Sequence, residues 1–193
     1  KSFDNNVVAT SELTTRVTEG TTTIYVTVEV SSSILLLPEV PMTGRLDNPR
    51  VGYFTNPLTN FSDGQQRVNK KQFITRWRLE PRPEDRAAYL RGELVEPRKP
   101  IVFYIENSTP YRWRKYIRQG IEDWQVAFER AGFKNAIIAK DITEDMEVDM
   151  DDVNYSVLTY AASTKANAMG PSILDPRSGE ILEADIMWWH NVL

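Results

Sequence analysis

The residues of this sequence that could bind a metal ion or transfer a proton lie mainly in its C-terminal half. His190 is the only histidine, and there is no cysteine. A protein zinc site needs three or four ligands, mostly histidine, cysteine or carboxylate. One histidine cannot build a histidine-rich site. We therefore interpret His190 as a packed or surface imidazole beside Trp188 and Trp189, with metal ligation as the less favoured reading.

A second candidate is the acidic segment 141–152, which carries seven carboxylates in twelve residues. Carboxylates stand at every second position of its centre, at Asp145, Glu147, Asp149 and Asp151. Calcium loops use such spacing because alternate side chains converge on one ion. An EF-hand loop has glycine at its sixth position, where this sequence has Met150. We predict a solvated charged loop and keep calcium binding as the alternative.

Other kinds of site are disfavoured by motif and composition. The sequence contains no G-x-G-x-x-G, no G-x-x-x-x-G-K-[ST] and no G-x-S-x-G, so nucleotide binding and serine nucleophiles are not predicted. A net charge of −4 argues against nucleic acid as a partner. The 193 residues suffice for one large domain or two small ones. No apolar run approaches 18 residues, so we predict no transmembrane segment.

Residues 1–80 are predicted to form a β-rich segment. Within 15–32, β-branched residues alternate around a Glu19-Gly20 turn, which is typical of a half-buried strand. Its apolar face would hold Ile24, Val26, Val28 and Val30. We expect a short buried run at 34–42, ended by prolines. Two further strands are predicted at 50–61 and 70–80, separated by the turn-rich stretch 62–66.

Residues 81–100 are predicted to be a linker, because they hold four prolines and many charges. A short helix at about 83–90 is expected there, opened by Pro83 and closed near Gly92.

Residues 101–193 alternate strand and helix patterns. Strands are predicted at 101–106, 135–142 and 154–163. A long helix is expected at about 110–131, with Ser108 or Thr109 as its N-cap and Gly132 as a left-handed C-cap. Its apolar stripe comprises Trp113, Ile117, Ile121, Trp124, Phe128 and Ala131. Strand, helix and strand in this order predict a parallel pair.

The end of the sequence combines a hairpin signature with an unusual apolar run. Residues 175–179, DPRSG, are a turn between two extended arms. Chain ends are usually polar and exposed, whereas residues 186–193 are crowded with apolar side chains. We expect this run to dock on a core within this chain or on a partner segment outside it.

Several segments together resemble bacterial zinc-dependent metalloproteases of the DUF5117/DUF4953 type, which are large exported proteins, frequent in Bacteroidetes, with a metzincin-like catalytic part. The resemblance covers most of residues 45–193. It rests on the ordered set RVGYFT, ITRWRLE, KPIVFYIENSTPYRWRKYIRQGIEDWQVAFERAGFKNAI, NYSVLTYAAS and ANAMGPSILDPRSGEILEADIMWWHNV.

The resemblance implies a fold class and a layout. It implies an α+β chain, with a β-rich N-terminal segment followed by the upper half of a metzincin-like domain: a twisted mixed sheet with one long backing helix. Residues 110–131 would match that helix. The arm at 168–174 would match the edge strand that pairs with an extended peptide substrate. The substrate-binding residues implied are Ala168, Met169, Gly170, Pro171, Ser172, Ile173 and Leu174.

The sequence departs from this family in one respect. The family's H-E-x-x-H motif, whose histidines bind zinc and whose glutamate is the general base, is absent. The family carries it downstream of the W-H-N-V segment. No catalytic residue and no metal ligand can therefore be assigned here, and zinc is expected in the full-length protein but not in this chain. The resemblance implies a fragment of an exported zinc endopeptidase that is inactive alone.

Two other readings and an assembly state stay open. The chain could be a non-catalytic binding or scaffold module of an exported bacterial protein, or a degenerate protease homologue that keeps peptide binding. A fragment would also expose apolar surface, which predicts a homodimer through the C-terminal segment. Apart from a dimer, the partner expected for the full-length protein is a peptide or protein substrate.

Overall fold

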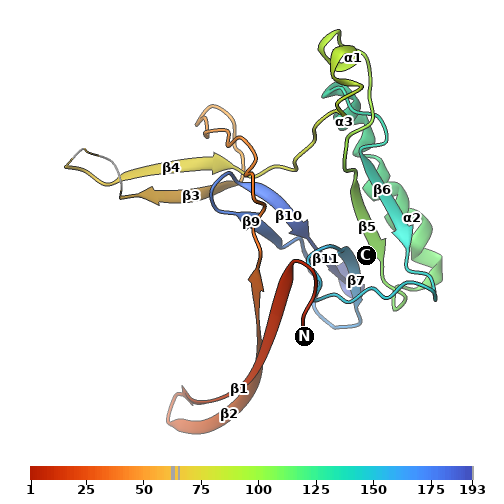
Figure 1. The fold of residues 1–193 in the computed structure, drawn as a ribbon. Helices are drawn as coiled ribbons and strands as arrows, with labels where there is room; N and C mark the ends of the chain where they lie inside the picture. Colours follow the sequence, from red (N-terminus) through yellow and green to blue (C-terminus); the bar gives the residue numbers. More distant parts are fainter. Residues whose placement is uncertain (62–63, 65, 193) are drawn as a thin grey trace.

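The computed structural model describes residues 1–61, 64 and 66–192 (Figure 1). Its largest sheet has five strands. In spatial order they are β6 (Ile137–Asp141), β5 (Ile101–Ile105), β7 (Ser156–Ala161), β11 (Ile186–Trp189) and β8 (Ala168–Met169). The first four run parallel, and β8 is antiparallel to β11. The chain is therefore a mixed α/β protein, and the predicted parallel pairing of 101–106 with 135–142 is confirmed.

The predicted long helix forms as two helices, α2 (Tyr111–Glu122) and α3 (Gln125–Arg130). Between them the hydrogen bonds tighten to three-residue spacing: Trp124 N–H donates to Ile121 at 3.4 Å, and Ala127 N–H to Trp124 at 2.9 Å. Such a tight turn rotates the following side chains relative to a regular helix. Trp124 is 63% exposed and Ala131 is also exposed, so the prediction that both belong to the packed stripe is wrong.

The start of α2 also differs from expectation. Pro110 is the N-cap, and no side chain caps the helix. Ser108 Oγ instead donates to Glu106, and Thr109 is buried. The Arg114 guanidinium donates to the carbonyls of Asn107 and Thr109. Binding to those carbonyls holds the entry turn without a serine or threonine cap. The predicted C-cap is confirmed, because Gly132 has φ of +95°.

The main core lies between α2 and the sheet. Alternate residues of a strand point to the same face. In β5 the alternate residues Ile101, Phe103 and Ile105 are all buried, so this face is directed into the core. Ile121 from α2 and Trp188 from β11 complete the centre of this cluster. Helix α2 runs alongside β5 and β6 in Figure 1, as the sequence pattern indicated. The core thus connects β5, at the beginning of residues 101–193, to β11, near their end.

A smaller core joins the linker to α3. The linker helix α1 (Arg86–Leu90) begins three residues later than predicted. Tyr89 stacks on Phe133 with ring centroids 5.0 Å apart, and Val95 is buried in the same cluster. A Cβ at Gly132 would lie 2.7 Å from the Tyr89 ring, so the close approach also needs glycine.

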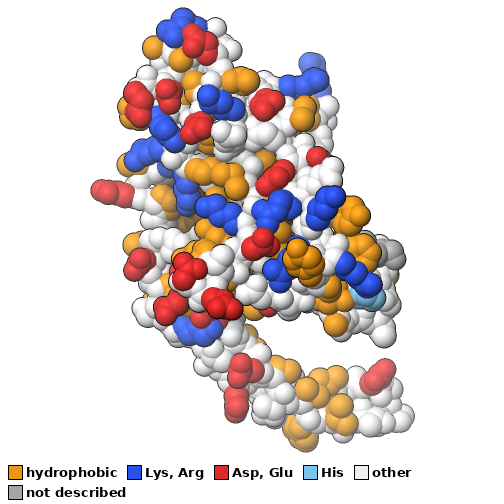
Figure 2. All heavy atoms as spheres, turned by 90° about the vertical axis from the view of Figure 1, so that its right-hand side faces the viewer, with side chains coloured by type: hydrophobic (Ala, Val, Ile, Leu, Met, Phe, Trp, Pro, Cys, Tyr) orange, Lys and Arg blue, Asp and Glu red, His pale blue; other side chains and the backbone are white. Residues whose placement is uncertain are grey.

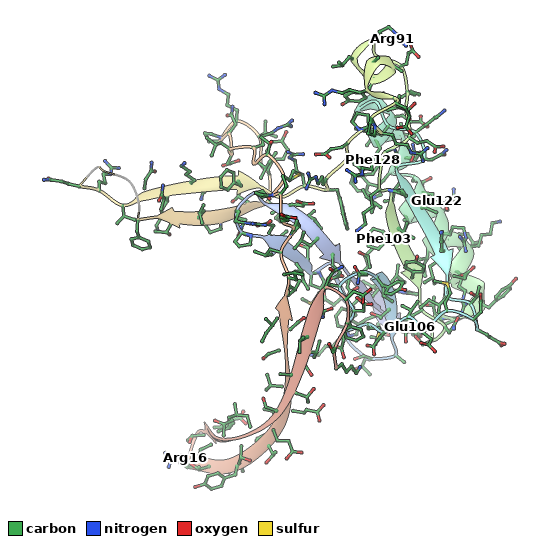
Figure 3. The ribbon with its side chains drawn as sticks, viewed as in Figure 1. Arg16, Arg91, Phe103, Glu106, Glu122 and Phe128 are labelled. Carbon is green, nitrogen blue, oxygen red and sulfur yellow. The ribbon has the colours of Figure 1, made fainter. Side chains whose placement is uncertain are left out.

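The N-terminal segment forms a long antiparallel hairpin, β1 (Asn6–Glu19) and β2 (Thr22–Leu35), which we call the arm. The arm projects from the rest of the molecule, and hydrophobic side chains are visible along it (Figure 2). Arg16 lies near its tip, far from Phe103 in the sheet (Figure 3). Ile24 is 53% exposed, so the prediction of a half-buried strand is wrong. The alternation is real, but no described element covers the apolar face.

The stretch at 34–42 also differs from its prediction. Ile34, Leu36 and Val40 are exposed, and only Met42 is fully buried. The expected buried run is therefore wrong. Beyond Leu35 the chain leaves the arm without joining another strand, so its side chains alternate between contact with neighbouring segments and solvent.

Two shorter hairpins complete the fold. The first pairs β3 (Thr55–Asn60) with β4 (Asn69–Ile74), close to the predicted strands; its predicted turn at 62–66 lies mostly outside the described residues. The second pairs β9 (Ser172–Asp175) with β10 (Glu180–Ala184), which confirms the predicted DPRSG hairpin. Gly179 has φ of +75°, and a Cβ there would lie 2.5 Å from the Ile74 carbonyl oxygen. The hairpins meet at this point.

None of the helices in the described residues is long and apolar enough to cross a membrane. The division of the chain into a β-rich segment (1–80), a linker (81–100) and a third part (101–193) stays a prediction.

The packing predicts very different costs for two isoleucine truncations. Ile105 is 0% exposed, so Ile105→Ala should lower the free energy of unfolding by about 2–5 kcal/mol through lost burial and a cavity. Ile34 is 69% exposed on the arm, so Ile34→Ala should change the free energy of unfolding by about 0.5 kcal/mol or less. Urea unfolding of both variants measures the difference, and equal costs would contradict the placement of the core.

Candidate functional site

The candidate site is the free edge of the five-stranded sheet at β8. Residues 165–172 are all exposed. On the other side of β8, Met169 pairs with Met187 and Ala168 with Trp188 of β11. A strand at the edge of a sheet presents unpaired backbone groups that can bind another extended chain. This edge is therefore available for a peptide.

Hydrogen bonds on either side of β8 fix which backbone groups face outward. The Asn167 carbonyl accepts from Trp189 N–H at 3.0 Å, and the Pro171 carbonyl accepts from Asp185 N–H at 3.0 Å. Because alternate residues of a strand direct their backbone groups to opposite sides, the odd-numbered residues face β11. Ala168 and Gly170 consequently direct their N–H and C=O groups toward the open edge.

One of these outward groups is already occupied. The Ala168 N–H donates to the side chain of Asn167 at 2.9 Å. The Ala168 carbonyl and both backbone groups of Gly170 remain directed to the open side. A docking peptide would thus meet two acceptors and one donor over a length of three residues.

The predicted substrate-binding residues are not one continuous edge strand. Ala168 and Met169 form β8, Gly170 and Pro171 connect it to the hairpin, and Ser172–Leu174 belong to β9. Here the prediction of a single strand is wrong. Pro171 has no N–H and cannot continue a ladder, and the chain changes sheet at this point. Ile173 and Leu174 are half-buried against β10.

The edge is tied to the core through the end of β11. Trp188 is buried beneath it, and the Tyr160 ring lies 5.0 Å from the Trp188 ring. Asn191 Nδ2 donates to the Thr164 carbonyl at 2.9 Å, which holds the loop that leads into β8. The backbone of the edge is therefore positioned by ordered contacts on its inner side.

His190 contacts the side chain of Tyr160. Its Nδ1 lies 2.7 Å from the Tyr160 hydroxyl, and the two rings meet edge to face. Among the described residues, no three histidine, cysteine or acidic side chains form a group that could hold a metal ion. His190 is exposed, which agrees with a surface imidazole, although its ring contact is Tyr160 rather than Trp188 or Trp189.

The acidic segment 141–152 lies against the base of the arm. Lys1 Nζ forms ion pairs with Asp149 at 3.0 Å and Asp151 at 2.7 Å. The Asp151 N–H and the Lys1 ammonium hold the pKa of Asp149 below its usual range. This part of the segment is thus partly neutralised by the chain itself.

Carboxyl groups buried around the β9–β10 hairpin were missed by sequence reasoning. Asp175 is fully buried and accepts hydrogen bonds from the Arg177 N–H at 2.9 Å and the Arg177 guanidinium at 2.7 Å. Glu180 and Glu183 are buried as well. The DPRSG turn was a signal for Asp175, because aspartate often bonds the backbone two residues on. Nothing in the sequence marked the two glutamates.

Comparison with known families gives one match. Residues 1–82 match the model of a family described as a domain of unknown function, DUF5117. The match supports the DUF5117 part of the resemblance, and the description carries no activity. Comparisons with curated proteins and with solved structures found no match.

The buried ion pair in the turn predicts a pH-dependent loss of stability. The Arg177 guanidinium holds the pKa of Asp175 below its usual value of 3.8. A lowered pKa stabilises the fold above the unfolded pKa, and this contribution is lost as pH falls through the folded one. Asp175→Asn should therefore lower the unfolding free energy at pH 7, and its difference from the wild type should shrink below about pH 4. Urea unfolding of the wild type and the variant, at pH 7 and at a pH below about 4, measures this. A difference in unfolding free energy that is the same at the two pH values would contradict it.

Proposed function

We propose that this chain is a fragment of an exported zinc-dependent endopeptidase, in which residues 1–80 end a β-rich N-terminal domain and residues 101–193 form the sheet half of the catalytic domain. The role of residues 101–193 would be to align an extended peptide along β8. The observation that carries the proposal is the exposed edge with outward backbone groups at Ala168 and Gly170. Support also comes from the ordered family-like segments, the mixed sheet and the helix α2 beside it. The layout implied by the resemblance also has a twisted mixed sheet with a helix beside it, although there the helix is one long element.

The residues of this chain do not fit a zinc site. The only histidine contacts Tyr160, and the described part of the chain offers no group of three ligands. We therefore assign no chemical step to this chain. In the proposed whole protein, an H-E-x-x-H helix supplied from outside residues 1–193 would hold the zinc that activates water.

Peptide alignment follows from ordinary sheet chemistry. An extended peptide that adds to a sheet edge gains affinity from main-chain hydrogen bonds, and alternate side chains give specificity. The inner side of β8 is already bonded to β11, so only the outer side can accept the peptide. Because the edge is short, we expect weak binding that depends on few hydrogen bonds.

Two alternatives share this edge. A non-catalytic binding module would need the peptide edge, or the exposed apolar face of the arm, and no zinc helix. A degenerate homologue would keep the edge after losing the helix. The exposure of both surfaces agrees with either reading. The sequence encoded after residue 193 separates them from the endopeptidase. Export and a homodimer through the C-terminal segment are part of the proposal as well. The backbone of β11 is paired with β7 and β8, so such a dimer would use exposed side chains of this segment, such as Met187 and Val192.

A matched pair of substitutions at Gly170 tests the edge. Gly170→Pro removes the outward N–H, whereas Gly170→Ala keeps it, and the added Cβ would meet only the Asp185 carbonyl at 3.8 Å. Extended peptides titrated against the chain should bind the wild type and Gly170→Ala similarly. Binding to Gly170→Pro should be about tenfold weaker or more, the equivalent of roughly one hydrogen bond.

The titration needs circular dichroism of both variants as a control for folding. Equal binding to the two variants would show that the peptide does not use this edge. No binding to the wild type at millimolar peptide would remove peptide alignment as the function of this chain.

A further inference from the structure

The β3–β4 hairpin ends in a tip that exposes apolar side chains. The last backbone pair of the hairpin is Asn60 with Asn69, and the hairpin projects from the rest of the molecule (Figure 1). Phe61 and Val68 follow directly beyond this pair, and they are 79% and 52% exposed. Burial of such side chains would stabilise the protein, because apolar surface is unfavourable in water. The tip therefore offers apolar groups to a partner outside both cores.

The same tip is basic. Arg67, Lys70 and Lys71 are exposed, and none of them forms an ion pair with an acidic side chain among the described residues. Residues 45–76 carry six lysine and arginine side chains and two aspartates, which gives a net charge of +4. The whole chain has a net charge of −4, so the remaining residues sum to −8. Positive charge is thus concentrated in the segment that forms this hairpin.

Protection of the strand edges explains only part of this arrangement. Exposed edge strands often carry lysine, because a charge discourages pairing with another chain. Lys70 stands opposite Thr59 and Lys71 opposite Leu58, so the two lysines lie on opposite faces of the hairpin. Edge protection gives no reason, however, for the apolar side chains at the tip. A surface that attracts both kinds of group accounts for the whole arrangement.

We propose that the tip of the β3–β4 hairpin docks on an anionic membrane surface, with Phe61 and Val68 inserted and the basic side chains bound to lipid headgroups. Interfacial helices bury their apolar face about 5–10 Å into the boundary between headgroups and acyl chains. At roughly 3.3 Å per residue, Lys70 and Lys71 stand about 7–10 Å behind Val68 along the strand. Their ammonium groups consequently reach the lipid phosphates when Val68 is inserted. Arg67 reaches the same level because its long side chain can extend toward the water.

The apolar residues favour a membrane over a soluble anionic polymer such as nucleic acid. Single-stranded nucleic acid is bound by a basic groove together with aromatic rings that stack on the bases. Val68 has no ring to stack, whereas both Phe61 and Val68 can enter hydrocarbon. Each lysine or arginine near an anionic membrane strengthens binding about fivefold. Three such side chains and a small apolar tip therefore predict reversible docking rather than permanent anchoring.

Co-sedimentation of the whole chain with lipid vesicles tests the proposal. Vesicles of phosphatidylglycerol and phosphatidylcholine in equal parts should bind the wild type, and vesicles of phosphatidylcholine alone should bind it at least about tenfold more weakly. Raising NaCl from about 0.05 to 0.5 M should weaken the binding to the anionic vesicles. Lys70→Gln should lower the affinity for these vesicles about fivefold. Phe61→Ser should lower it about tenfold, because the inserted ring is lost.

Two substitutions outside the hairpin are the matched controls. Lys115→Gln removes an exposed lysine from α2, and Leu90→Ser removes an apolar side chain that is 76% exposed on α1. Both control variants should bind the anionic vesicles like the wild type. Circular dichroism of all four variants checks that each keeps the fold.

The proposal is overturned if the wild type does not sediment with the anionic vesicles, or if Phe61→Ser binds them as tightly as the wild type. It is equally overturned if the two controls lose as much affinity as the tip variants, since the contact would then lie elsewhere. Heparin serves as a soluble anionic polymer in a parallel titration. Binding to heparin without binding to vesicles would identify a soluble partner instead of a membrane. The peptide edge and the endopeptidase play no part in these outcomes.

Discussion

The position of β11 between β7 and β8 is the constraint on which the rest of the structure depends. Its parallel pairing with β7 buries Trp188 in the main core, and its antiparallel pairing with β8 orients the exposed edge. Asp185, just before β11, accepts a hydrogen bond from the Val157 N–H of β7 and lies beside the buried Glu183. One short strand thus connects the core, the candidate peptide edge and the buried carboxyl groups.

The buried acids give this part of the molecule its chemical character. Asp175 is compensated by the adjacent Arg177, so it stays ionised and fixes the turn. At Glu183, burial together with the neighbouring Asp185 carboxylate and a hydrogen bond to it raises the pKa to about 8. Two carboxyl groups of one hairpin therefore hold opposite protonation states at neutral pH. The difference comes from the guanidinium beside Asp175, and from burial and the adjacent carboxylate at Glu183.

Local patterns in the sequence predicted the elements better than their surroundings. The parallel pair β5 and β6, both short hairpins and the Gly132 cap followed from periodicity and turn residues, whereas the parallel pairings of β7 and β11 were not predicted. The break at Trp124 had no such signal, because neither glycine nor proline stands there. The exposed face of the arm shows that alternation predicts a strand but not what covers it. The edge strand was predicted from the family resemblance. Its interruption at Pro171 could be recognised only from the strand pairing in the structure. Acidic side chains are expected at the surface, so the burial of Glu183 could not be foreseen.

The most direct test of the central claim is to read the gene that encodes this chain past residue 193. If the chain is the sheet half of a zinc endopeptidase, an in-frame H-E-x-x-H should appear within roughly the next hundred codons, because that helix supplies the ligands missing here. A stop codon directly after residue 193, or a continuing frame without this motif, would contradict the endopeptidase. Peptide binding without catalysis would then be the function to pursue.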